Sequence, residues 1–204
     1  MRKPVILLIG GATGTGKSTV ATDVAHRLGI TRVTSTDVVR QTLRAFFAPE
    51  YMPSIHRSSF DAAPGEPLVD AFLAQTTEVL VAVEATVDRA IDEGWSMVLE
   101  GVHLVPGMLA VSAEQAIVVQ CVLAIDDEDA HAGHFWIRDV ASHGLRPVQK
   151  SLERLGDIRK LQEFIVERAR ETGTPVIQNT SVETTVSAVI ELVLGTAAEQ
   201  LERV

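Results

Sequence analysis

The sequence contains very little cysteine, with Cys121 as its only one. A single thiol cannot form an internal disulfide, so the fold does not depend on an oxidising compartment. The neighbours of Cys121 are apolar and no basic residue adjoins it, which predicts a buried side chain rather than a reactive thiol. Apolar runs long enough to span a membrane are absent, and the short run after Lys3 leads into glycines rather than a cleavage site. We therefore expect a cytoplasmic protein without a membrane partner.

Basic residues are scarce relative to acidic ones. The chain has 18 Lys and Arg against 27 Asp and Glu, which gives a formal net charge of -9. Such a surface repels nucleic acid and acidic membranes except where cations cluster. With 204 residues, 46% of them hydrophobic, the chain is expected to form one domain over residues 1–204 rather than a disordered or fibrous protein. The sequence leaves the oligomeric state open, with a dimer as one option.

Strand-like and helix-like segments alternate along the whole chain, without repeats or low-complexity linkers. Most strand candidates are continuous apolar runs, which are typical of parallel sheets covered by helices on both faces. We therefore predict an α/β fold with a five-stranded parallel sheet flanked by helices. The expected strands are residues 5–9, 32–35, 97–100, 117–125 and 175–178, and the clearest helices are 17–28, 67–93, 152–172 and 182–194.

Two segments fit this alternation poorly. Residues 46–65 are rich in proline and polar side chains, and residues 126–147 are charged and rich in histidine. Long excursions inside a compact domain often serve as lids or binding loops. We expect an acceptor-binding excursion at about 38–66 and a lid at about 126–147. The histidines of the second excursion lack the cysteines and spacing of a zinc site, so a metal role is disfavoured.

The strongest motif follows the first strand and opens the first helix. Its eight residues match the G-x-x-x-x-G-K-[ST] pattern of a phosphate-binding loop. Backbone N–H groups of such a loop point at phosphate oxygens, Lys17 reaches the β- and γ-phosphates, and the Ser18 hydroxyl binds Mg²⁺. The sequence thus predicts a nucleotide site for ATP with Mg²⁺. The residues expected to bind nucleotide are Gly11, Ala12, Thr13, Gly14, Thr15, Gly16, Lys17, Ser18 and Thr19.

Two carboxylates are expected at the same edge of the sheet as this loop. Asp37 follows the second strand, where it could accept or orient the proton of an attacking hydroxyl. An alternative role for Asp37 is to cap the helix expected to begin at Val38. Glu100 ends the third strand, where it could hold Mg²⁺ or orient the acceptor. We assign catalytic roles to Asp37, Lys17 and Glu100, and metal binding to Ser18 and Glu100.

Donor-rich side chains near Asp37 could bind an anionic acceptor. Arg40 and Arg44 are four residues apart and share a helix face, where they could grip a carboxylate or phosphate, although exposed surface arginines are the alternative. His56, Arg57 and Ser58 add donors in the first excursion. In the second excursion, Arg138 and Arg146 are the candidates to reach the transferring phosphoryl group when the lid closes, with Arg138 in a catalytic role and Arg146 among the acceptor-binding residues.

With these residues in view, the sequence resembles the 2-phosphoglycerate kinase family of P-loop kinases. The resemblance is carried by five strings: residues 10–19, Ser-Thr-Asp-Val-Val-Arg at 35–40, His-Arg-Ser-Ser-Phe at 56–60, Leu-Glu-Gly-Val-His-Leu-Val-Pro-Gly at 99–107 and Asp-Ile-Arg-Lys-Leu-Gln at 157–162. It implies a phosphotransferase that uses ATP and Mg²⁺ on a small phosphorylated hydroxy acid, with a nucleoside-kinase-like sheet and a lid. It also implies that Asn179 lies near the adenine, and His103 joins the expected acceptor-binding residues.

Two other functions remain open at this point. A phosphotransferase on the same scaffold could use a neutral hydroxylated acceptor of the antibiotic or sugar-nucleotide type. A nucleotide-dependent regulator would bind the nucleotide without any acceptor. The guanine-reading Asn-Lys-x-Asp string of GTPase switches does not occur in the sequence, which disfavours a GTPase.

Overall fold

Five short segments form one parallel sheet in the computed structural model, which describes residues 3–112, 114–141 and 148–202. The strands lie in the order β2-β3-β1-β4-β5. All five expected strands are confirmed, and their bounds differ from expectation by at most one residue. They are β1 (Val5–Gly10), β2 (Val33–Ser35), β3 (Met97–Glu100), β4 (Ile117–Ala124) and β5 (Val176–Gln178).

The central strand β1 explains why the apolar runs are continuous. It pairs with β3 on one side and with β4 on the other, so neither edge is free. Ile6, Leu7, Leu8 and Ile9 are each at most 1% exposed, because helices cover both faces of the sheet.

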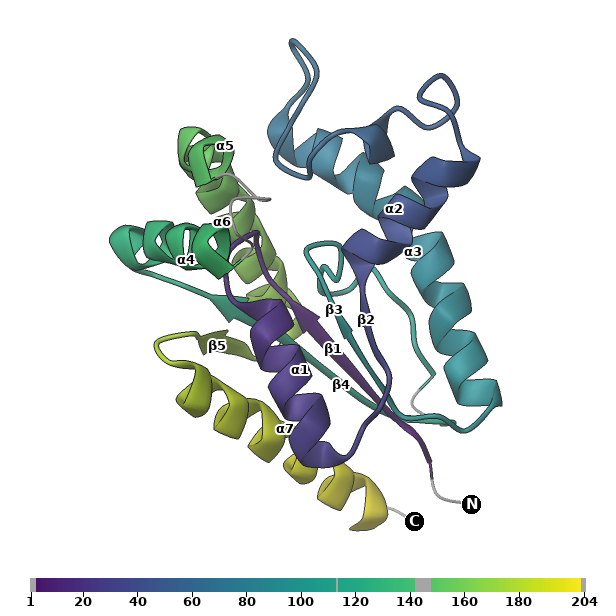
Figure 1. Cartoon of the computed structure of the whole chain (residues 1–204). Coiled ribbons are helices and arrows are strands. Elements are labelled where there is room, and N and C mark those ends of the chain that lie inside the picture. Colours follow the sequence, from purple (N-terminus) through teal and green to yellow (C-terminus); the bar gives the residue numbers. More distant parts are fainter. Residues whose placement is uncertain (1–2, 113, 142–147, 203–204) are drawn as a thin grey trace.

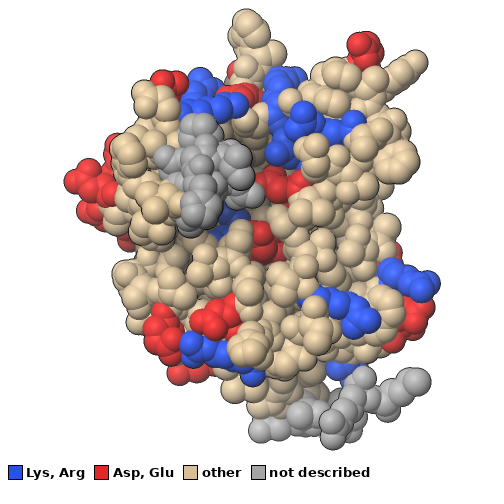
Figure 2. All heavy atoms as spheres, viewed as in Figure 1, with Lys and Arg blue, Asp and Glu red and all other residues tan. Residues whose placement is uncertain are grey.

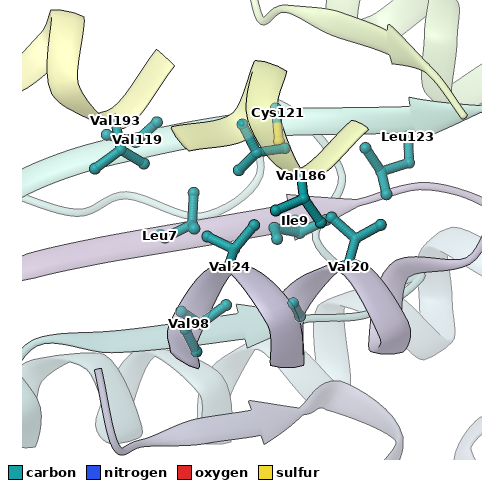
Figure 3. Close-up of a cluster of buried hydrophobic side chains, with 13 residues drawn as sticks. Leu7, Ile9, Val20, Val24, Val98, Val119, Cys121, Leu123, Val186 and Val193 are labelled. Atoms are coloured by element: carbon teal, nitrogen blue, oxygen red, sulfur yellow. The ribbon is translucent and has the colours of Figure 1, made fainter. Parts of the chain in front are cut away.

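Helices α1 (Lys17–Leu28) and α7 (Val182–Glu202) cover one face of the sheet (Figure 1). Leu7 and Ile9 of β1 meet Val20 and Val24 of α1 there (Figure 3). Cys121 lies in the same cluster, and its burial raises the pKa of the thiol to about 12. The prediction of a buried cysteine is therefore confirmed.

Helices α3 (Leu68–Asp92) and α6 (Leu155–Thr172) cover the opposite face. The sequence predicted one helix from residue 152 onward, whereas the structure places the short helix α5 (Val148–Glu153) before α6. The two are separated at Arg154, whose backbone is not helical. Its guanidinium group donates to the carbonyl oxygen of Phe60 at 2.9 Å, so it binds the first excursion.

The two excursions lie above the carboxyl ends of the strands (Figure 1). The first contains α2 (Thr36–Phe46) and the short 3-10 helix η1 (Ser54–His56), next to α3. The second forms α4 (Glu128–Ala141), next to α5. Within the residues that the structure describes, no helix is long and apolar enough to cross a membrane.

Candidate active site

The phosphate-binding loop joins β1 to α1, as the motif predicts. Gly14 and Gly16 have φ angles of 88° and 84°, which side chains rarely adopt. A Cβ atom on Gly14 would lie 2.6 Å from the ring of Phe135, and one on Gly16 would lie 2.3 Å from Nδ2 of Asn179. Both positions therefore need glycine for their backbone conformation and for the close approach of neighbouring side chains.

Lys17 and Ser18 lie at the start of α1, where Gly16 is the residue before the helix. The Nζ atom of Lys17 donates to the carbonyl oxygen of Ala12 at 2.7 Å, so the buried ammonium lies against the loop. The hydroxyl of Ser18 donates to Oε1 of Glu100 at 2.9 Å. Glu100 is only 6% exposed, and it lies opposite Ile9 of β1 in the sheet. A hydroxyl and a carboxylate side by side are oxygen ligands of the kind that Mg²⁺ prefers.

Asp37 lies at the same edge, in the first turn of α2. The alternative role, in which Asp37 caps a helix that begins at Val38, is wrong, because α2 begins at Thr36 and Ser35 is its cap. The hydroxyl of Ser35 accepts from the backbone N–H of Asp37 at 3.2 Å. This leaves the carboxylate 65% exposed, with Arg40 3.2 Å away. The Asp37 carboxylate is thus exposed at the edge of the sheet that carries the phosphate loop, with Arg40 as its partner.

His103 is not exposed to an acceptor, contrary to the expectation that it binds one. Its side chain is completely buried, with Nδ1 at 2.9 Å from Oγ1 of Thr36 and Nε2 at 2.9 Å from Oε1 of Gln75. Since an amide oxygen only accepts, Nε2 of His103 donates to Gln75 and Nδ1 accepts from Thr36. Burial lowers the pKa of His103 to about 4, so the ring is neutral near pH 7. It fixes the start of α2, next to Asp37, against α3.

Arg40 and Arg44 do not form the expected pair of anion-binding arginines. Nη1 of Arg40 donates to the carbonyl oxygens of Ile55 and Arg57 at 3.2 and 2.6 Å. Arg44 instead donates to Oε1 of Gln41 at 3.2 Å. The sequence shows that the two arginines share a helix face but not that the chain returns over Arg40 fifteen residues later. Arg40 therefore holds the chain around η1 against α2.

Three basic side chains, which we call the basic rim, gather where the first excursion meets α5 and α6: Arg57, Lys150 and Arg154. Lys150 donates to the hydroxyl of Ser58 at 3.0 Å. Each basic group also lies near a carboxylate, as Arg57 does with Glu66 at 2.5 Å. Figure 2 shows basic side chains gathered along the top of this face of the molecule. Of the expected acceptor residues, Arg57 and Ser58 therefore lie together.

The remaining expected residues have other positions. His56 contacts the carbonyl oxygen of Phe47 through Nε2 at 2.8 Å. The backbone of Arg138 lies in α4, but its side chain lies outside the described part of the structure, as does all of Arg146. Asn179 is buried against the phosphate loop, and its expected place near the adenine stays a prediction. Its Nδ2 donates to the carbonyl oxygen of Thr15 at 2.9 Å.

Two residues that contact the loop were not expected there. His131 and His134 of α4 contact the carbonyl oxygens of Thr13 and Gly14 at 2.8 and 3.0 Å. From the sequence alone, these histidines are considered only as ligands of a zinc ion. Their spacing of three residues, which places both on one helix face, was the signal that could have shown that they act together.

Comparisons with known proteins agree with this geometry, although no family model matches the chain. It is 36% identical to the 2-phosphoglycerate kinase of Pyrococcus furiosus over 100% of this chain and 68% of that protein. The corresponding protein of Methanothermobacter thermautotrophicus is 36% identical over 99% of this chain and 69% of its own length. The 2-phosphoglycerate kinase of Methanopyrus kandleri is 37% identical over 94% of this chain and 61% of that protein.

Solved structures with little sequence identity share the fold. The shikimate kinase of Acinetobacter baumannii matches with a TM-score of 0.52 at 17% identity, over 95% of this chain and 94% of that one. The shikimate kinase of Aquifex aeolicus gives a TM-score of 0.51 at 18% identity, over 95% and 98%. The fold is thus that of P-loop kinases. The chain spans about two thirds of the length of these curated relatives. Their sequence identity, together with the shared fold, places the chain in the 2-phosphoglycerate kinase family.

Proposed function

We propose that the chain is an ATP-dependent kinase that transfers the γ-phosphoryl group to the hydroxyl of 2-phosphoglycerate. The observation that carries the proposal is the contact of Ser18 with Glu100 beside the phosphate loop, in a chain 36% identical to a protein named 2-phosphoglycerate kinase. Family membership supports the acceptor, and the contact supports the phosphoryl chemistry.

The nucleotide end of the proposed site consists of the loop amides, Lys17, Ser18 and Glu100. The glycine conformations and the buried ammonium fit a triphosphate, and the Ser18 and Glu100 oxygens fit Mg²⁺. When bound there, Mg²⁺ supplies positive charge that offsets the charge of the phosphates. Lys17 would bind the β- and γ-phosphates and hold them in line with the acceptor.

Asp37 is the proposed base. Ser35 pairs with Glu100 across β2 and β3, so the first turn of α2 begins beside the proposed metal-binding carboxylate. The acceptor oxygen bonds to the γ-phosphorus while the bond from that phosphorus to the bridging oxygen of ADP breaks. The proton of the hydroxyl passes to the Asp37 carboxylate and then to water. Arg40 and the His103 contact with Thr36 orient the start of α2 for this step.

The basic rim is the proposed site for the anionic groups of the acceptor. 2-Phosphoglycerate carries a phosphate and a carboxylate, and guanidinium groups bind both with paired hydrogen bonds. Arg57, Lys150 and Arg154 come from two separate parts of the chain that meet at residues 58–61. A bound acceptor would therefore hold α5 and the first excursion together. The lid role of residues 126–147 and the part of Arg138 and Arg146 in it stay predictions.

An acceptor panel tests the proposal. The purified chain is incubated with ATP, Mg²⁺ and one acceptor, and phosphorus NMR follows new phosphate esters. We expect transfer to 2-phosphoglycerate, none to glycerol and none by Lys17→Ala. Preferential transfer to glycerol would support the neutral-acceptor alternative, and release of phosphate without transfer would support a regulator.

A further inference from the structure

Three consecutive carbonyl groups of the phosphate loop are each bound by a side chain from elsewhere in the chain. His131 contacts the oxygen of Thr13, His134 that of Gly14, and Asn179 that of Thr15. The two histidines belong to α4, and Asn179 follows β5. The loop is thus held from outside on the side that faces these elements.

Because the peptide unit is rigid, the contacts at these carbonyl groups also fix the direction of the neighbouring N–H groups of the loop. A trans peptide unit is planar, with its C=O and N–H groups on opposite sides. A side chain that fixes the carbonyl of Thr13 therefore directs the N–H of Gly14 away from α4. In the same way His134 directs the N–H of Thr15 and Asn179 that of Gly16. The backbone nitrogen of Thr15 lies 3.4 Å from the carbonyl oxygen of Ala12, which is a long hydrogen bond that a bound phosphate oxygen would replace.

Packing alone does not explain why a histidine occupies position 131, because burial of its polar ring costs free energy. Its side chain is completely buried and stacks on the Phe135 ring, with centroids 5.4 Å apart. Its Nδ1 atom is buried without a hydrogen-bond partner among the described residues. An apolar side chain would fill this space without leaving a polar atom unpaired. Burial also lowers the pKa of His131, so the neutral ring donates through Nε2 to Thr13.

We propose that His131 and His134 are positioning residues, which hold the amides of the phosphate loop in the direction that binds the nucleotide phosphates. This inference rests on the proposed function in taking the loop as a nucleotide site. It gives α4 a second role beside that expected of a lid, because the first half of the helix fixes the loop. Loss of either contact weakens nucleotide binding and leaves the acceptor site unchanged.

The two histidines use different ring atoms, which permits a crossed test. His131 uses Nε2 and His134 uses Nδ1. The amide nitrogen of glutamine lies about where Nε2 of histidine does, and that of asparagine about where Nδ1 does. His131→Gln and His134→Asn therefore keep a donor in place, whereas His131→Asn and His134→Gln remove it.

The experiment compares His131→Gln, His131→Asn, His134→Gln and His134→Asn. The affinity for ADP is measured by calorimetry, and KM for ATP, KM for 2-phosphoglycerate and kcat are measured by turnover. We expect His131→Gln and His134→Asn to bind ADP within about threefold of the unchanged protein, because a donor remains. His131→Asn and His134→Gln should weaken ADP binding and raise KM for ATP by about tenfold, the effect of one hydrogen bond. Neither kcat nor KM for the acceptor should change.

His26→Asn and His26→Gln serve as matched controls, because His26 is exposed on α1. Thermal unfolding checks that each variant folds. If the variants at the buried position 131 unfold, the pair at the half-buried position 134 decides the question. Equal ADP affinities for Gln and Asn at position 134, or a fall in kcat without a change in KM for ATP, would overturn the inference. A complete lack of ADP binding by the unchanged protein would contradict the proposed function itself, and the inference with it.

Discussion

The Ser18 hydroxyl donates a hydrogen bond to the Glu100 carboxylate at 2.9 Å and so links the start of α1 to the end of β3. The two residues are 82 positions apart in the chain. They meet because β1 and β3 are neighbouring parallel strands whose carboxyl ends lie at one edge. This contact places the proposed metal ligands beside the loop.

Replacement of Glu100 by Gln should raise the Mg²⁺ requirement of the reaction. The amide keeps an oxygen near Ser18 but removes the negative charge that attracts the cation. We expect the Mg²⁺ concentration for half-maximal rate to rise by about tenfold or more, as for other losses of carboxylates around metal sites. Rates measured over a series of Mg²⁺ concentrations check this. Glu163→Gln, an exposed position on α6, is the control and should match the unchanged protein. An unaltered Mg²⁺ dependence in Glu100→Gln would remove this residue from the metal site.

Replacement of Asp37 by Asn should slow the chemical step without weakening nucleotide binding. General-base catalysis contributes about 10²–10⁴ to a rate, so we expect kcat to fall by that factor. KM for ATP should stay within about twofold, since Asp37 does not belong to the phosphate loop. Asp88→Asn on the exposed side of α3 is the matched control. A kcat within about tenfold of the parent would show that Asp37 is not the base.

Replacement of Lys150 by Met should weaken acceptor binding alone. The change keeps most of the side-chain length but removes a charge that lies 3.0 Å from the Ser58 hydroxyl. We expect KM for 2-phosphoglycerate to rise by about tenfold, because a charged hydrogen bond contributes about 1.5–3 kcal/mol. KM for ATP should not change. Lys160→Met provides a close control, since Lys160 is 68% exposed against 64% for Lys150 and also lies near a carboxylate. Equal effects of the two substitutions would exclude a specific role for the basic rim.

His103 should make the folded protein less stable in mild acid. Its pKa is lowered to about 4 in the folded protein, against about 6.5 in an unfolded chain, so the unfolded state binds a proton first as pH falls. The stability that neutral His103 contributes to the folded protein is fully present above about pH 6.5 and is lost as the pH falls toward 4. Over that window the loss approaches about 3 kcal/mol.

Chemical unfolding at pH 7, 6 and 5 measures this dependence. The variant His103→Gln keeps a donor toward Gln75 and cannot gain a proton. We expect it to be less stable than the parent at pH 7, because the contact with Thr36 is lost, and to lose less stability on acidification. His131, whose pKa burial also lowers, is unchanged in both proteins, so its contribution cancels in the comparison. Parallel pH curves for the two proteins would contradict the assignment to His103.

The strands and the edge of the site could be predicted because they depend on local patterns. Continuous apolar runs identify strands covered on both faces, and parallel strands place Ser18, Asp37 and Glu100 at one edge. The side-chain partners could not be predicted in this way. His103 is held by Gln75, which lies 28 positions earlier on α3, and Arg40 is covered by a loop with no regular spacing. Both contacts depend on how segments far apart in the chain pack together, which local sequence patterns do not encode.

The hold of Asn179 on the loop affects the order in which the site forms during synthesis. The motif residues leave the ribosome early, but the side chain that fixes the carbonyl of Thr15 follows 164 positions later. Its own oxygen then accepts from Thr185 in α7 at 2.8 Å. A nascent chain that has emerged only as far as β4 therefore carries the motif without the contacts that shape it. We expect tight nucleotide capture to begin only after β5 and the first turn of α7 have joined the sheet.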